Sequence, residues 1–81
     1  MTETEAYQLV LVAITKVAPS KVQKVTEDSD LLSGDILDSL DVMNFLFELE
    51  QRLGKKLTAI DESYNDFRVK SLLNIICASQ P

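Results

Sequence analysis

The chain of 81 residues is 46% hydrophobic and 26% charged, with a net charge of −5, so it can build one small domain around a single core. It contains no histidine, which excludes His-based catalytic triads and His metal ligands, and we expect neither a metal site nor enzymatic activity. One cysteine, apolar runs too short to span a bilayer and an acidic N-terminal segment indicate a cytoplasmic protein with no internal disulfide, membrane segment or signal peptide.

The first predicted element is a helix over residues 3–17. Thr2 and Glu5 have the spacing of a capping box. Apolar residues then recur at steps of three and four and define one buried face: Ala6, Leu9, Val10, Ala13, Ile14 and Val17. Pro19 ends the helix, because the residue before a proline is biased away from helical geometry.

Residues 18–38 have no clear hydrophobic period and are predicted to form a long loop. A long loop without secondary structure in a compact domain is either functional or a misassigned element. Several apolar side chains along it should hold it against the rest of the domain, so we expect it to be ordered. These side chains are Val22, Val25, Leu31, Leu32 and Ile36.

Acidic residues dominate the middle of the chain. Between Val25 and Gln51 there is no Lys or Arg. The acids in this window are Glu27, Asp28, Asp30, Asp35, Asp38, Asp41, Glu48 and Glu50. A block of one sign repels nucleic acid and attracts basic protein surfaces, although a merely solvated acidic face is the alternative interpretation.

The segment Asp38-Ser39-Leu40 begins a second helix, predicted to run from Ser39 to about Leu53 and to stop at Gly54. Backbone N–H groups are unpaired in the first turn of a helix, and the helix dipole is positive there. A phosphate attached to the hydroxyl of Ser39 would therefore be well placed. The alternative is structural, with Asp38 as the helix cap and Ser39 as an ordinary first residue.

Two sets of apolar residues recur along the helix 39–53. The first has the spacing of a core face and comprises Val42, Phe45, Leu46, Leu49 and Leu53. The second comprises Leu40, Met43 and Phe47. Its border is polar or acidic, with Asp38, Asp41, Asn44, Glu48 and Glu50. The second set is either an extension of the core or a docking surface for partner proteins.

Two further helices are predicted towards the C-terminus. A brief one begins at Asp61-Glu62 and reaches about Asp66. The last one runs from Ser71 to about Ser79, with its apolar face formed by Leu72, Leu73, Ile75 and Ile76. Cys77 lies within it and, with no histidine to activate it, is expected to be a small buried or half-buried hydrophobic residue. The prediction is thus an all-α four-helix bundle with three longer helices and one short one.

The chain resembles acyl carrier proteins and peptidyl carrier proteins, loosely over nearly all 81 residues. The resemblance rests on Asp38-Ser39-Leu40, on Leu31-Leu32, Gly34 and Ile36-Leu37 before it, and on the helix that follows. It implies a single carrier domain, residues 1–81, with an acyl-carrier-like bundle. It also implies that a phosphopantetheinyl transferase attaches 4′-phosphopantetheine from coenzyme A to Ser39, between Asp38 and Leu40.

The same resemblance implies how the carrier works. The thiol of the prosthetic group would carry an acyl or aminoacyl thioester between enzymes, as in fatty acid or polyketide biosynthesis, and the carrier would catalyse nothing itself. Loading and processing enzymes with basic surfaces would dock on Asp41, Met43, Phe47 and Glu48. A monomer is expected, without nucleic-acid partners.

Alternatives remain within and outside the family. The chain could be a dedicated aminoacyl or D-alanyl carrier, or a helical interaction module that is never modified. Asn44, Gln51 and Arg52 stand where fatty-acid carriers often have glutamate, and the start of the last helix appears one residue short of the family pattern. Because Phe45 and Phe47 are bulky for a helix that opens to admit an acyl chain, short or polar cargo is favoured.

Overall fold

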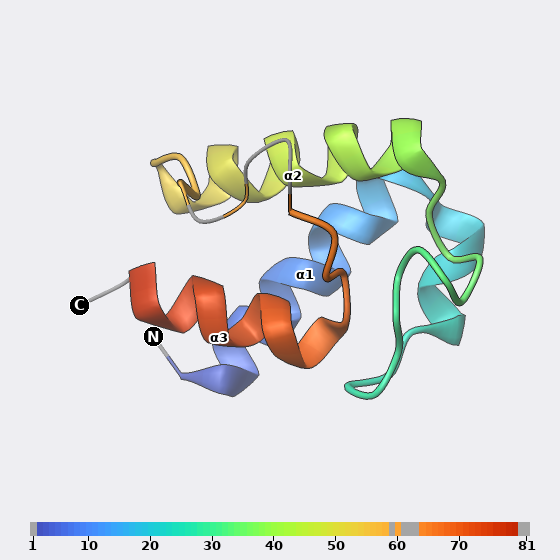
Figure 1. The fold of residues 1–81 in the computed structure, drawn as a ribbon, viewed down its shortest axis with the longest axis horizontal. Coiled ribbons are helices and arrows are strands. Elements are labelled where there is room, and N and C mark those ends of the chain that lie inside the picture. Colours follow the sequence, from blue (N-terminus) through green and yellow to red (C-terminus); the bar gives the residue numbers. More distant parts are fainter. Residues whose placement is uncertain (1, 59, 61–63, 80–81) are drawn as a thin grey trace.

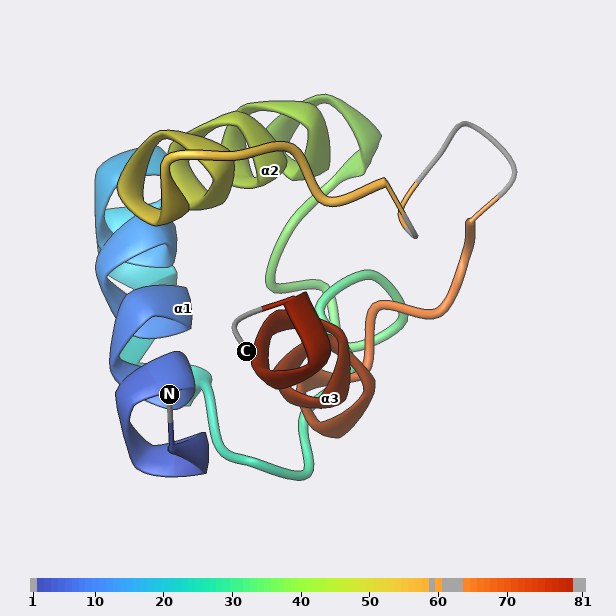
Figure 2. The ribbon, with the colours of Figure 1, turned by 90° about the vertical axis from the view of Figure 1, so that its left-hand side faces the viewer.

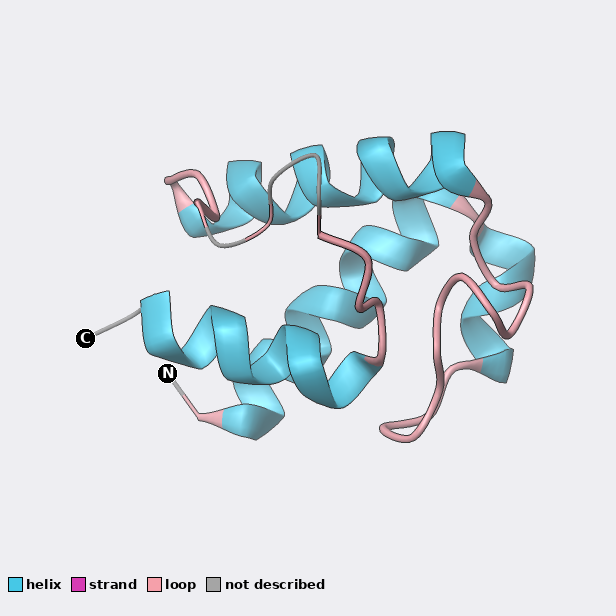
Figure 3. Ribbon diagram, viewed as in Figure 1, coloured by secondary structure: helices cyan, strands magenta, loops and turns pink. Residues whose placement is uncertain are grey.

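The computed structural model describes residues 2–58, 60 and 64–79, and within them it contains helices and loops without a strand (Figures 1 and 3). Three α-helices are present: α1 at Glu3–Val17, α2 at Ser39–Leu53 and α3 at Val69–Ser79. A short 3₁₀ helix, η1, spans Pro19–Lys24. The prediction of a small all-α bundle with three longer helices and one short one is confirmed. None of the described helices has the length and apolar character needed to cross a membrane.

The predicted bounds of α1 are confirmed, and so is its capping box. The amide of Glu5 donates to the hydroxyl of Thr2 at 3.1 Å, while the amide of Thr2 donates to the carboxylate of Glu5 at 3.0 Å. The two hydrogen bonds satisfy N–H groups that a helix start otherwise leaves unpaired. The hydrogen bond from the Thr2 amide also holds the pKa of Glu5 below its ordinary value, because it stabilises the ionised carboxylate.

Helix α1 is the element that the other helices share. It packs against η1, α2 and α3. In Figure 2, α1 is upright, α2 crosses its upper end, and α3 is seen nearly end-on, so its axis lies across that of α1. Buried apolar side chains from the predicted core faces are Ala6, Val10, Ala13 and Ile14 of α1, Val42, Phe45 and Leu49 of α2, and Leu72, Leu73 and Ile76 of α3. Val69 of α3 is buried as well, although it was not part of a predicted face, while the predicted Leu9, Val17, Leu46, Leu53 and Ile75 are only partly buried. Residues of the connecting segments complete this core: Val25, Leu31, Ile36, Leu37, Leu57 and Phe67.

The segment between α1 and α2 is ordered, as predicted, but its first part is helical. The loop is held down by buried Val25, Leu31 and Ile36, while Val22 and Leu32 are partly buried against the core. Prediction missed η1 because six residues of 3₁₀ geometry show no 3.6-residue hydrophobic period.

The C-terminal part differs from prediction in two respects. Helix α3 begins at Val69, two residues before the predicted start at Ser71. The short helix predicted from Asp61 to Asp66 is not found in its described part, because residues 64–66 are not helical, and residues 61–63 lie outside the described residues. The short helix of the bundle is therefore η1.

A backbone pairing ties the first loop to the start of α3. Asp30 and Arg68 form an isolated antiparallel bridge, in which the amide of Leu31 donates to the carbonyl of Phe67 and the amide of Val69 to the carbonyl of Ser29, both at 2.9 Å. An ion pair between Lys70 and Asp28, 3.0 Å long, lies beside it. These contacts therefore join the first loop to the N-terminal end of α3.

Side chains reinforce the same junction. The carboxylate of Asp66 accepts two hydrogen bonds of 2.8 Å from the guanidinium of Arg68 and one of 2.7 Å from the hydroxyl of Ser71. These donors, the arginine first, hold the pKa of Asp66 well below its ordinary range. The Asp66 carboxylate thus remains ionised and fixes the entry of the chain into α3.

Candidate functional site

Ser39 is the first residue of α2 and is exposed to solvent. Asp38 before it has extended backbone geometry and accepts a hydrogen bond from the amide of Asp41 at 2.7 Å, so it is the N-cap that the sequence predicted. The amides of Ser39 and Leu40 have no hydrogen-bond acceptor within the described part of the chain. These N–H groups and the helix dipole leave the serine at a favourable position for an anion.

The loop before Ser39 is held by a close backbone approach at Gly34. Its amide donates to the carbonyl of Asp30 at 2.9 Å, and a Cβ atom on Gly34 would lie 2.6 Å from the same carbonyl oxygen. Asp35 follows with a left-handed φ of 57°, and the amide of Leu37 then donates to the carbonyl of Leu31 at 2.8 Å. Position 34 thus requires glycine, because there is no room for a Cβ atom there.

Side chains fix the same turn. The carboxylate of Asp30 accepts hydrogen bonds from the amides of Leu32 and Ser33, both at 3.0 Å. These hydrogen bonds, the one from Ser33 foremost, lower the pKa of Asp30. On the other side of the turn, the ammonium group of Lys21 in η1 donates to the carbonyl of Asp35 at 3.1 Å. The backbone that delivers Ser39 is therefore anchored from two directions.

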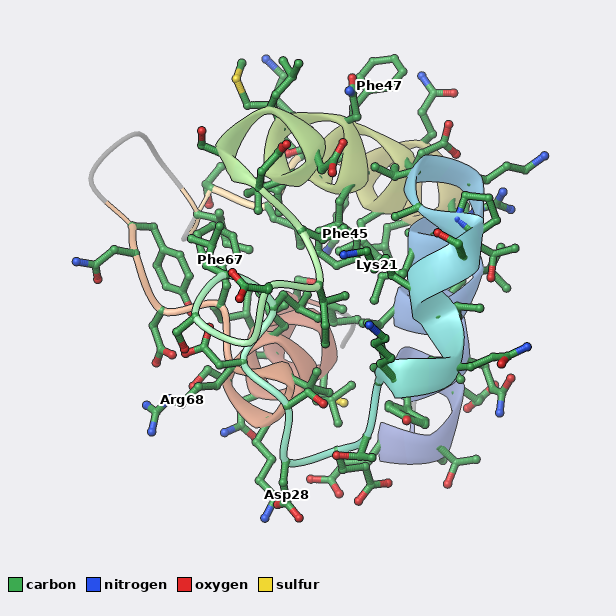
Figure 4. The ribbon with its side chains drawn as sticks, turned by 90° about the vertical axis from the view of Figure 1, so that its right-hand side faces the viewer. Lys21, Asp28, Phe45, Phe47, Phe67 and Arg68 are labelled. Carbon is green, nitrogen blue, oxygen red and sulfur yellow. The ribbon has the colours of Figure 1, made fainter. Side chains whose placement is uncertain are left out.

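An exposed apolar strip, formed by Leu40, Met43 and Phe47, runs along α2 from the serine. Their exposed fractions are 68%, 69% and 59%, so these side chains are not an extension of the core. Phe45 faces the opposite way and is fully buried, and Figure 4 shows its ring directed inward while Phe47 projects from the molecule. Of the two interpretations left open by the sequence, only a solvent-facing surface fits these exposures.

The acids beside the strip are not equivalent. Asp38 is exposed and Asp41 is half-buried, both at the serine end of α2. Glu48 forms an ion pair of 3.7 Å with Arg52 one turn later. Glu50, predicted to border the strip, instead accepts a hydrogen bond from the amide of Leu57 at 2.9 Å and so stabilises the segment after α2.

A groove of about 710 Å³ lies next to Ser39. Its walls come from the first loop, from α2 and from the segment before α3. The described lining residues are Leu32, Ser39, Val42, Met43, Leu46, Ile60, Tyr64 and Phe67. Apart from the serine and the tyrosine these side chains are apolar, and the volume is within the range of small-molecule pockets.

Neither Phe45 nor Phe47 lines this groove. One ring is in the core and the other is exposed on the surface, so neither obstructs the space beside the serine. The bulk of these two side chains therefore does not narrow the groove, and short or polar cargo stays an untested prediction.

Sequence reasoning also missed Tyr64 and Phe67 as site residues. Their rings make an edge-to-face contact with centroids 5.4 Å apart. The hydroxyl of Tyr64 is buried without a hydrogen-bond partner among the described residues, and burial raises its pKa. Cys77, by contrast, is half-buried against the core in α3, as predicted.

The site thus combines an exposed serine at the start of a helix, a fixed turn before it, an apolar groove beside it and an exposed apolar strip along α2. The predicted residues Asp38, Ser39 and Leu40 are adjacent at this point, and Met43 borders both the groove and the strip. The chain matches no protein-family model, no curated protein and no solved structure.

Proposed function

We propose that the chain is a carrier protein in which a phosphopantetheinyl transferase attaches 4′-phosphopantetheine to the hydroxyl of Ser39. The observation that carries the proposal is the position of this hydroxyl. It is solvent-exposed on the first residue of α2, directly after an N-cap, where a transferase can reach it. The resemblance of Asp38-Ser39-Leu40 and its surroundings to carrier proteins supplies the identity of the group.

The residues around Ser39 fit a phosphodiester. The amides of Ser39 and Leu40 have no acceptor within the described chain, and the positive end of the helix dipole lies at the same place. The nearby acids Asp38 and Asp41 favour approach of a basic enzyme surface over approach of a free anion. When bound, the group would supply a flexible thiol for thioester formation, while the protein would provide its position and the surface that enzymes recognise.

The groove beside Ser39 supports sequestered apolar cargo. Its described walls are mostly aliphatic and aromatic, and its volume of about 710 Å³ is within the range of small-molecule pockets. An acyl chain attached at the serine would therefore have an apolar space within reach. Acyl groups as in fatty acid or polyketide biosynthesis suit this groove better than a short polar group does.

The exposed strip also favours a second candidate, a helical interaction module that is never modified. Leu40, Met43 and Phe47 are exposed whether or not Ser39 carries a group. In this candidate Asp38 and Ser39 are only the cap and first residue of α2. The two functions differ in one measurable property, which is the mass of the protein after exposure to coenzyme A and a transferase.

The test is incubation with coenzyme A and a broad-specificity phosphopantetheinyl transferase, followed by intact mass analysis. The wild type should gain one phosphopantetheinyl group, and Ser39→Ala should gain none while remaining folded, because Asp38 still caps α2. Ser20→Ala is the matched control, since Ser20 is also exposed near the start of a helix and should not affect modification. An unmodified wild type, or a modified Ser39→Ala, would favour the interaction module.

A further inference from the structure

A second groove, of about 340 Å³, lies at the far end of α2 from Ser39. It is lined by Phe47, Glu50, Gln51, Gly54, Lys55 and Lys56. The exposed strip therefore does not end on a flat surface. The ring of Phe47, 59% exposed, is its last member and also forms one wall of this groove.

Two of the three charged residues that line this groove are lysines, and the third is Glu50. Lys55 and Lys56 are exposed, and neither takes part in an ion pair within the described chain. Lys55 donates a hydrogen bond to the backbone carbonyl of Ser79, which holds it in place without neutralising it. Glu50 likewise keeps its charge while it accepts a hydrogen bond from the amide of Leu57, so the two lysines leave the groove with a net positive charge.

The charge of the surface along α2 consequently changes from negative to positive over its length of about 22 Å. Asp38 and Asp41 make the serine end negative. In the middle of α2, beside the apolar strip, the opposite charges of Glu48 and Arg52 form an ion pair and cancel. The lysines make the C-terminal end positive.

We propose that the partner enzymes dock along this whole surface, with a basic side chain at the serine end and an acidic side chain beside an apolar one in the groove at Phe47. This inference rests on the proposed carrier function, because it describes the enzymes that act on the group at Ser39. A wholly basic partner surface would be attracted at one end and repelled by Lys55 and Lys56 at the other.

A second copy of the chain is a weaker occupant of the same surface. Two antiparallel copies of α2 would bring opposite charges together. However, the acids that a copy could offer are short and committed to their own helix. Asp38 accepts from the amide of Asp41, and Asp41 is half-buried, so neither reaches into a groove as a glutamate on a partner would.

The experiment uses three synthetic amphipathic helical peptides with one shared leucine face. Their polar faces are all-Lys, all-Glu, or a block of Lys followed by a block of Glu. Each is titrated into the ¹⁵N-labelled unmodified protein, with affinity and amide shifts measured by NMR. The block peptide should bind roughly twofold to fivefold more tightly than the all-Lys peptide, the range of one or two exposed ion pairs. Its shifts should extend from Leu40 to Lys56.

The double variant Lys55→Glu/Lys56→Glu should reverse this order and prefer the all-Lys peptide. Lys16→Glu/Lys24→Glu is the matched control, because it changes the net charge equally at exposed sites outside α2 and should leave the order unchanged. Equal or tighter binding of the all-Lys peptide to the wild type would overturn the proposal. So would dimerisation of the free protein in sedimentation that Phe47→Asp abolishes. Because the peptides bind unmodified protein, these outcomes are separate from the mass test at Ser39.

Discussion

Replacing Asp38 by alanine removes the side-chain N-cap of α2. The carboxylate oxygen accepts from the amide of Asp41 at 2.7 Å, and alanine offers no acceptor for that N–H group. Loss of such a cap costs about 1 kcal/mol of unfolding free energy, within a range of roughly 0.5 to 2 kcal/mol. For a domain of this size, about 1 kcal/mol corresponds to a fall in melting temperature of roughly 4–8 °C.

Asp38→Asn separates the cap from the charge. Asparagine keeps the side-chain acceptor, so the cap persists, and only the attraction of a negative charge to the helix dipole is lost, about 0.3–1 kcal/mol. Transfer of phosphopantetheine to Ser39 should nevertheless slow in both variants, because a basic enzyme loses one attractive charge beside the serine. The slowing should diminish at high ionic strength, where the wild type is screened as well.

The assay combines thermal unfolding followed by circular dichroism with the initial rate of mass gain. Asp38→Ala should have a lower melting temperature and a slower mass gain than the wild type. Asp38→Asn should mainly have the slower mass gain. An unchanged melting temperature in Asp38→Ala would refute the capping argument. A rate in Asp38→Asn equal to that of the wild type at low salt would refute the electrostatic one.

Three further changes test other parts of the site. Gly34→Ala should destabilise the protein by about 1–3 kcal/mol in chemical denaturation, because its Cβ would lie 2.6 Å from the carbonyl of Asp30; unchanged stability would exclude this close approach. Loading the modified protein with an octanoyl group should raise the melting temperature above that of the unloaded form, since a chain bound in the groove stabilises the folded state; an equal temperature would mean the chain stays in solvent. Hydrogen bonds from Arg68 lower the pKa of Asp66, so its stabilisation is present above the unfolded pKa of about 4 and is lost as the pH falls further. Asp66→Asn should weaken the pH dependence of the melting temperature below that pH, whereas Glu27→Gln, at an exposed position, should not. Identical profiles of melting temperature against pH for the two variants would contradict the role of Asp66.

The long helices could be predicted because their signals are local. Thr2 with Glu5, and Asp38 with Gly54, mark helix ends through hydrogen bonds within a few residues. The early start of α3 was missed because it depends on tertiary contacts. Val69 is the first residue of α3, and its amide donates to the carbonyl of Ser29. The residues next to Val69 in the sequence give no sign of this distant partner.

The same distinction applies to the site. Ser39 was recognisable from its neighbours in sequence, and the exposure of Leu40, Met43 and Phe47 was one of two expectations. The groove could not be predicted, because its walls come from three separate segments that only the folded chain brings together. Likewise, no local pattern distinguishes Glu50, bonded to Leu57, from an acid free to face a partner.

The bridge between Asp30 and Arg68 also joins a segment that precedes Ser39 to one that is synthesised well after it. The bridge joins positions far apart in the chain, and such contacts form only after the entropy of closing the intervening segment has been overcome. A nascent chain that contains only α1, η1 and α2 still lacks residues 67–69, whose backbone is hydrogen-bonded to the first loop. The turn at Gly34 can form earlier, because its hydrogen bonds lie within residues 21–37, whereas the pairing of the first loop with residues 67–69 forms only after Val69 has been synthesised. If the proposed transferase recognises the paired loop, it would discriminate against unfinished chains, although the serine itself is synthesised near the midpoint.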